Sequence, residues 1–99
     1  AVNQDPLGKL ATCVHAIGEL RIYVKELEDG SKAGGFCNFD REKAELAIRD
    51  FDKLGITGKQ TVRDLWRQKD IKTLDAGREA LSLNVPAHGV LLYKFKPVQ

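Results

Sequence analysis

The chain has 99 residues, of which 42% are hydrophobic and 30% are charged, and this composition excludes a disordered chain and fits one folded domain with a single core. The 16 basic and 14 acidic residues leave a net charge of +2 at pH 7. Asp64 and Asp70 interrupt the longest basic cluster, residues 63–72. So small a net charge, without a continuous basic cluster, argues against a nucleic-acid partner.

The first nine residues favour a linker over a regular element. Asp5-Pro6 and Gly8 are typical of turns and extended segments. The chain contains no Met, no signal-peptide pattern and no apolar run long enough to span a membrane, so no membrane partner is expected. We therefore expect residues 1–9 to be an interdomain linker, residues 10–99 to be one domain, and the whole to be a piece of a longer protein. Its cellular location stays open.

The segments that follow show the period of half-buried strands. Residues 10–17 are rich in β-branched side chains, and in residues 20–25 apolar and polar side chains alternate. Residues 28–31 contain Asp-Gly, which favours a hairpin turn because both residues tolerate positive φ. A strand is expected over residues 32–39, where Gly34-Gly35 predicts either a bulge or a close approach of the two sheets.

Residues 40–55 support two interpretations. Asp40 could cap a helix, Gly55 could end it, and the apolar residues between them fall on one helical face. Residues 44–48 also alternate between apolar and polar side chains, as a strand does. Periodicity alone favours the helix.

The rest of the chain indicates short strands separated by turns. Residues 67–77 are polar and turn-rich, with at most a short strand within residues 71–74. Pro86–Gly89 is an expected turn. The expected strands of this part are residues 61–66, 81–85 and 90–95. Seven or eight short strands at this spacing predict an all-β fold, an antiparallel sandwich of two sheets.

The residues offer no complete catalytic constellation. A nucleophile needs an oriented base, but the chain has only His15 and His88, and neither Ser31 nor Ser82 lies in a Gly-x-Ser-x-Gly run. Its aspartates lie in or near expected turns, which Asp favours for backbone reasons, so no pair stands out as the two carboxylates of a glycosidase. The glycines form no phosphate-binding loop. We expect no catalytic residue and no cofactor here.

A zinc site is conceivable from ligand type. Cys13, His15, Cys37 and His88 are suitable ligands, and Cys13 and His15 would share one strand face. Their spacing matches no compact zinc motif, so structural roles are favoured and no metal is expected. The two cysteines could form a disulfide, but free thiols are favoured because no dense cysteine framework surrounds them.

The aromatic side chains also have two interpretations. Tyr23, Phe36, Phe39 and Trp66 could stack on sugar rings, but aromatic residues in strands more often belong to the core. If Trp66 is core, its replacement by Ala would cost about 3–5 kcal/mol of stability.

Three runs, taken together, resemble one family. Residues 2–9, Val-Asn-Gln-Asp-Pro-Leu-Gly-Lys, resemble the Asn-Gln-Asp-Pro-Leu-Gly segment of the α-galactosidases and α-N-acetylgalactosaminidases of glycoside hydrolase family 27. Residues 62–66 resemble an Arg-Asp-Leu-Trp strand of that family, and residues 85–92 resemble its closing hairpin. Residues 20–27 match one of its strands, and Cys37-Asn38 falls where the family commonly has Phe-Asn. Order and spacing fit along nearly the whole chain.

The resemblance implies a C-terminal β-sandwich that follows a (β/α)8 catalytic barrel. It implies a strand over residues 43–49 and a helical turn at residues 52–55, against the periodicity. It gives structural roles to Asp64, Leu65 and Trp66 and to Pro86, His88 and Gly89. The two catalytic aspartates of these retaining glycosidases lie on the barrel, so none carries over to this chain. Gly34-Gly35 departs from the apolar residues that are usual in the family.

The leading hypothesis is therefore a non-catalytic structural domain of an α-galactosidase-like hydrolase, with one outer face docked on the preceding barrel. The alternative is a carbohydrate-binding module that makes weak sugar contacts through exposed aromatic side chains, and it predicts two or three coplanar rings on one face. A third hypothesis is an unrelated immunoglobulin-like interaction domain, which would have no barrel before it.

Overall fold

The computed structural model describes residues 12–98, and in this part of the chain every regular element except one 3-10 turn is a strand. The elements are β1 (Thr12–Ile17), β2 (Leu20–Glu26), β3 (Lys32–Asn38), β4 (Ala44–Ile48), η1 (Phe51–Leu54), β5 (Lys59–Asp64), β6 (Lys69–Asp75), β7 (Leu81–Val85) and β8 (Val90–Pro97). The prediction of seven or eight strands is confirmed. No helix among the described residues is long and apolar enough to cross a membrane.

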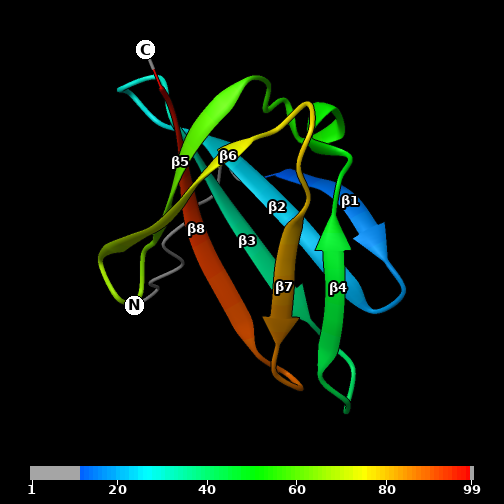
Figure 1. Ribbon diagram of the computed structural model, residues 1–99. Helices are drawn as coiled ribbons and strands as arrows, with labels where there is room; N and C mark the ends of the chain where they lie inside the picture. Colours follow the sequence, from blue (N-terminus) through cyan, green and yellow to red (C-terminus); the bar gives the residue numbers. More distant parts are fainter. Residues whose placement is uncertain (1–11, 99) are drawn as a thin grey trace.

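The strands form two antiparallel sheets of unequal size. The large sheet has the order β1-β2-β3-β8-β5-β6, and the small sheet pairs β4 with β7. Figure 1 shows β4 and β7 lying across one face of the large sheet. The predicted two-sheet sandwich is confirmed. We call the face toward β4 and β7 the inner face of the large sheet and the opposite one its outer face.

The main core lies between the sheets because alternate side chains of each strand point to the same face. In β2 the buried side chains are those of Leu20, Ile22 and Val24. The small sheet contributes side chains such as Leu83, and η1 contributes Phe51, whose ring packs edge-on against that of Phe95 with centroids 6.2 Å apart. Aromatic burial of this kind gives a small domain much of its apolar stabilisation.

Residues 44–48 form a strand, as the resemblance implies, so the helix favoured by periodicity is wrong. Ile48 pairs with Leu81 and Ala44 with Val85 along the whole of β4. The chain then turns through η1, and Gly55 ends this turn at φ 74°, a conformation that glycine adopts without strain. Pairing with β7 and burial of one side of β4 outweigh the local propensity for a helix.

Gly34 leaves room for a neighbouring aromatic ring, and β3 has no bulge at this position. β3 keeps an uninterrupted register with both β2 and β8. A Cβ atom built on Gly34 would lie 3.1 Å from Cε2 of Phe95. Of the two alternatives predicted for Gly34-Gly35, the bulge is therefore wrong. The close contact at Gly34 is made with Phe95 of β8, the neighbouring strand of the same sheet, and not with the small sheet.

Two expectations for residues 61–77 are wrong. β5 ends at Asp64, so Trp66 lies in the following turn, where 64% of it is exposed. β6 runs over the whole of Lys69–Asp75, although a short strand at most was expected. Leu74 is the one buried residue of this edge strand, and an edge strand with so little burial lacks the apolar alternation that reveals strands in a sequence.

Candidate functional site

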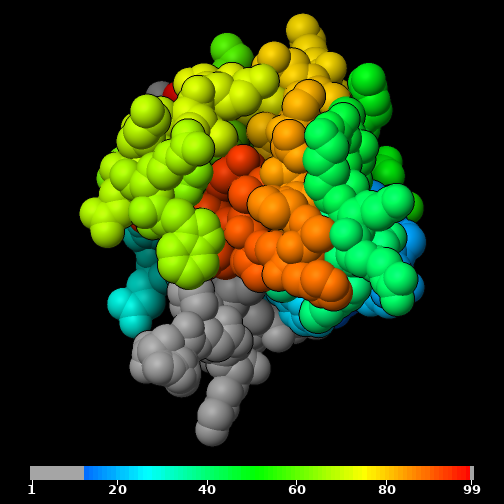
Figure 2. Space-filling view, turned by 90° about the horizontal axis from the view of Figure 1, so that it is seen from below, coloured from blue at the N-terminus to red at the C-terminus, as the bar shows by residue number. Residues whose placement is uncertain are grey.

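The residues predicted to have structural roles lie in two turns that Figure 2 views from below. Asp64, Leu65 and Trp66 are at the β5–β6 turn, and Pro86, His88 and Gly89 are in the β7–β8 turn. In Figure 2 the β5–β6 region is yellow-green, and a hollow with red-orange β8 as its floor separates it from orange β7 and green β4. The expected linker, residues 1–9, lies outside the described residues.

Asp64 and Leu65 hold the β5–β6 turn. Oδ1 of Asp64 accepts hydrogen bonds from the backbone N–H groups of Trp66 at 2.9 Å and Arg67 at 3.1 Å. The N–H of Leu65 donates to the carbonyl oxygen of Leu92 at 2.9 Å. Burial and then the Asp64 carboxylate raise the pKa of Tyr93 on β8. The turn thus leaves the Trp66 indole at the surface.

The β7–β8 turn is built from backbone contacts. The N–H of Gly89 donates to the carbonyl oxygen of Pro86 at 2.9 Å, and a Cβ atom on Gly89 would lie 2.9 Å from that same oxygen. His88 has φ 53°, and its N–H donates to the carbonyl oxygen of Asp40 at 3.1 Å. The His88 side chain is exposed, so its contribution to this turn comes from the backbone.

Asn38 joins the β7–β8 turn to the loop between β3 and β4, and the sequence interpretation gave it no role of its own. Its Nδ2 group lies 2.9 Å from the carbonyl oxygen of Glu42, 3.2 Å from that of Val85 and 3.1 Å from that of Pro86. Its Oδ1 accepts the N–H of Asp40 at 2.9 Å. Asn38 is only 3% exposed, and buried amides of this kind are normally fully hydrogen-bonded. The sequence signal that could have revealed this role is a polar residue, Asn38, at the end of a strand that was expected to be buried.

Ser31 and Asp29 form a second polar cluster in the β2–β3 turn. The backbone N–H of Ser31 donates to Oδ1 of Asp29 at 3.0 Å, its hydroxyl donates to the same oxygen, and Nζ of Lys94 lies 3.0 Å from Oδ2. The hydroxyl and N–H of Ser31, followed by Lys94, hold the pKa of Asp29 well below its ordinary value. Ser31 is therefore a buried turn residue with a carboxylate as its partner, and not a nucleophile beside a base.

Other carboxylates also serve turns or ion pairs. Oδ1 of Asp40 accepts the N–H of Glu42 at 3.3 Å, and Oδ1 of Asp75 accepts the N–H of Gly77 at 3.2 Å. Asp70 pairs with Arg63 at 3.1 Å. For Asp40, Asp64 and Asp75 the backbone explanation of their positions is confirmed.

The four candidate zinc ligands do not come together. A register shift separates Cys13, which pairs with Tyr23, from His15, which pairs with Ile22, so the two lie on opposite faces of the sheet and the expected shared face is wrong. His88 lies in the β7–β8 turn. The described residues contain no group of three His, Cys, Asp or Glu side chains that could hold a metal ion.

The same arrangement decides the question of a disulfide between the two cysteines. β2 lies between the strands of Cys13 and Cys37, so their Cα atoms are about 9 Å or more apart. A disulfide needs Cα atoms within about 7 Å of each other. Cys13 and Cys37 therefore do not pair with each other.

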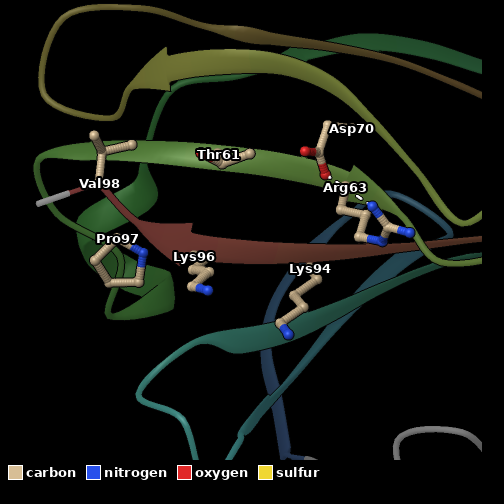
Figure 3. Close-up of a pocket in the computed structure, with 7 residues that line it drawn as sticks. All are labelled: Thr61, Arg63, Asp70, Lys94, Lys96, Pro97 and Val98. Atoms are coloured by element: carbon tan, nitrogen blue, oxygen red, sulfur yellow. Dashed lines mark hydrogen bonds and ion pairs between the residues drawn. The ribbon is translucent and has the colours of Figure 1, made fainter.

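A depression of about 420 Å³ lies on the outer face of β5 and β8. Figure 3 shows Arg63, Lys94 and Lys96 around it, with Lys94 and Lys96 extending from the same side of β8. Arg63 binds Asp70 and donates to the carbonyl oxygen of Gln68 at 2.6 Å, and Lys94 binds Asp29. Two of these three cations are therefore already paired, and among the described residues Lys96 is the one without an acidic partner, which leaves a single unpaired positive charge for a small anion.

Comparison with known proteins shows which enzymes contain a segment similar to this chain. The alpha-galactosidase A of Cellvibrio japonicus is 31% identical over 112 residues, which cover 98% of this chain and 26% of that relative. A relative from Aspergillus flavus, also named as an alpha-galactosidase A, is 31% identical over 96 residues, and there the chain spans 17% of the relative's length. This chain thus corresponds to about a quarter or less of these relatives.

Solved structures of similar enzymes contain the same fold. Alpha-galactosidase I from Mortierella vinacea superposes with a TM-score of 0.75 at 27% identity, over 96% of this chain and 25% of that one. A GH27 β-L-arabinopyranosidase from Geobacillus stearothermophilus superposes with a TM-score of 0.78 at 18% identity, over 90% of this chain and 20% of that one, which shows the shared fold. The family described as the alpha galactosidase C-terminal beta sandwich domain matches residues 17–95. The resemblance noted in the sequence is confirmed, and the chain belongs to this family of C-terminal β-sandwich domains.

Proposed function

We propose that this chain is a non-catalytic structural domain of an α-galactosidase-like enzyme whose barrel hydrolyses terminal α-galactosides. The observation that carries the proposal is the family match over residues 17–95 in a chain that spans 26% of its Cellvibrio relative. The remaining three quarters or so of such a relative can accommodate a (β/α)8 barrel, which typically needs about 250 residues. The preceding barrel is then the partner of this domain.

The side chains of the domain support a structural role. Asp40, Asp64 and Asp75 accept hydrogen bonds from turn N–H groups, and a retaining glycosidase needs two carboxylates that face a sugar instead. Most of the buried apolar residues form the core between the two sheets. In this proposal the barrel carries out the hydrolysis, and the sandwich domain stabilises the folded enzyme.

The test compares the parent enzyme with a variant that lacks residues 12–98. We expect the parent reading frame to encode a barrel before this domain and the parent to hydrolyse 4-nitrophenyl α-galactoside. The truncated enzyme should melt at a lower temperature and lose activity faster on heating. A parent frame without a barrel would overturn the proposal, and so would hydrolysis by the sandwich domain alone.

A sugar contact is a second candidate, favoured by two exposed aromatic residues. Phe39 is 56% exposed and follows β3, while Trp66 is 64% exposed and follows β5. β3 and β5 both run antiparallel to β8, so both strands finish toward the same end of the large sheet. Titration with galactose and with galactomannan should shift the fluorescence of Trp66, the single tryptophan of the chain. An unchanged spectrum would reject this candidate, and so would an equal affinity of the Trp66→Ala variant and the unmodified domain in titration calorimetry.

A further inference from the structure

The β2–β3 turn contains the one Asp-Gly pair of the chain, Asp29-Gly30. Such a pair is prone to a covalent rearrangement, because the small glycine lets its own backbone nitrogen reach the carboxyl group of the aspartate. Gly30 is exposed, and a Cβ atom built on it would meet no atom within 4 Å. Figure 1 shows this turn in cyan at the upper end of the large sheet. Packing around Gly30 therefore does not prevent the rearrangement.

The rearrangement consists of two steps. The Gly30 nitrogen attacks Cγ of Asp29, a C–N bond forms, and the N–H proton leaves with the carboxyl OH as water, which closes a five-membered succinimide ring. Water then opens the ring. Addition at Cγ restores aspartate, whereas addition at the backbone carbonyl carbon of Asp29 gives isoaspartate, whose main chain runs through the former side chain. The first step needs a freely rotating side chain and a neutral carboxyl group, since a carboxylate oxygen is a poor leaving group.

The contacts of the folded turn oppose both requirements. Oδ1 of Asp29 accepts the backbone N–H of Ser31 at 3.0 Å and also the Ser31 hydroxyl, and Oδ2 lies 3.0 Å from Nζ of Lys94. The carboxylate is thus fixed toward the residue two positions ahead, as in an Asx turn. The hydrogen bonds from Ser31, followed by Lys94, also lower the pKa of Asp29 and so keep the group ionised.

The attacking nitrogen is also held in place. The N–H of Gly30 donates to the carbonyl oxygen of Leu27 at 3.2 Å, and the N–H of Leu27 donates to the carbonyl oxygen of Ser31 at 2.9 Å. The turn connects β2 and β3, which both have a paired strand on each side. The Gly30 nitrogen can therefore reach Cγ of Asp29 only when these bonds break and the turn opens.

We propose that Asp29-Gly30 is a latent isoaspartate site, and that the contacts of Asp29 with Ser31 and Lys94 protect it while the β2–β3 turn is folded. When the turn opens, the pair rearranges and becomes a substrate for an enzyme that methylates isoaspartyl carboxyl groups. The rearrangement adds one methylene group to the main chain between β2 and β3, and fully buried Ser31 loses its carboxylate partner. This inference is independent of the proposed function.

Incubation of the full protein that contains this domain tests the proposal. Trypsin releases residues 26–32, in which Asp29 is the single aspartate, and an isoaspartyl methyltransferase with a labelled methyl donor detects the modified peptide. At about pH 6 we expect the folded protein to form isoaspartate at least about tenfold more slowly than the same protein in urea, because a pKa lowered by one unit already makes the neutral carboxyl group about tenfold scarcer. Equal rates in the folded and unfolded protein would overturn the proposal.

Two variants distinguish these contacts from the fold as a whole. Ser31→Ala should form isoaspartate about tenfold faster than the unmodified protein, whereas Ser82→Ala, at an exposed position of β7, should keep the unmodified rate. Lys94→Gln should show a smaller acceleration, and Lys53→Gln on η1 none. If Ser31→Ala folds and keeps the unmodified rate, the proposal fails. If it does not fold, Lys94→Gln decides, since Lys94 is partly exposed, and a rate equal to that of Lys53→Gln would overturn the proposal.

Asp29→Asn separates the position of the side chain from its protonation. The same attack then releases ammonia and needs no neutral carboxyl group, while the N–H and hydroxyl of Ser31 can still bind Oδ1. We expect this variant to deamidate more slowly when folded than in urea, measured by the mass of the same tryptic peptide. Equal deamidation in the two states would show that the turn leaves the side chain free to be attacked, and would overturn the proposal without affecting the proposed function.

Discussion

Asn38 in β3 donates a hydrogen bond to the carbonyl oxygen of Val85 in β7, 47 residues away in the sequence, over 3.2 Å. This bond joins the large sheet to the small one. The same amide also binds the carbonyl oxygens of Glu42 and Pro86, so one buried side chain ties the β3–β4 loop to the β7–β8 turn. The family resemblance pointed to Pro86, His88 and Gly89 of this turn, and the structure adds Asn38 as the residue that holds it.

Asn38→Ala should lower the free energy of unfolding by about 1–3 kcal/mol, because buried carbonyl oxygens would lose their donor. Urea unfolding of the domain measures this. Asn84→Ala is the matched control, since Asn84 is exposed on β7 and its loss should cost less than about 0.5 kcal/mol. Equal losses in the two variants would contradict the role of Asn38.

Gly89→Ala should also destabilise the domain, by about 1–3 kcal/mol, because the new Cβ would lie 2.9 Å from the backbone oxygen of Pro86 and the turn must open. Gly77→Ala is the control, since the atom nearest to its Cβ would be Oδ1 of Asp75 at an ordinary 3.7 Å. Thermal melts of both variants should show a drop for Gly89→Ala only. A similar melting temperature for the two would show that the turn adapts freely.

Asp29 should make the domain sensitive to acid. Its pKa in the folded state lies below the ordinary 3.8, mainly through the Ser31 hydroxyl. The carboxylate therefore stabilises the fold above about pH 4, and this stabilisation is lost as the pH falls further, because the unfolded chain takes up the proton first. In Ser31→Ala the pKa should rise toward 3.8, while Lys94→Gln should raise it less. The carbon-13 shift of the Asp29 carboxyl group reports each titration, and an ordinary midpoint in the unmodified domain would refute this account.

Trp66→Ala should leave stability within about 0.5 kcal/mol, because most of the residue is exposed. Phe36→Ala should cost about 3–5 kcal/mol, since Phe36 is fully buried and its ring packs 5.8 Å from that of Tyr93. Urea unfolding compares the two aromatic residues directly. A large loss for Trp66→Ala would instead place the indole in a packed environment.

Several parts of the fold follow from local pattern. The alternation in residues 20–25 and 81–85 predicts β2 and β7, because one face of each strand is buried and the other is not. Asp29-Gly30 marks the β2–β3 turn, where Gly30 has φ 86°. At the candidate site the sequence indicated the turn residues and the lack of a catalytic constellation, but not the partners of Asn38 or the exposure of Trp66.

The sequence by itself determined the strand-rich fold, because residue period and turn chemistry are local properties, and the resemblance of three runs of residues to a known family indicated a C-terminal sandwich domain. The tertiary structure decided the rest. Residues 44–48 are a strand because β7 pairs with them, and Trp66 is at the surface because β5 ends two residues earlier. The second apolar cluster, around Ala33 and Leu92, forms only because β2, β3 and β8 lie side by side. What covers each face of a sheet depends on contacts between residues far apart in the chain. Local sequence patterns do not predict such contacts.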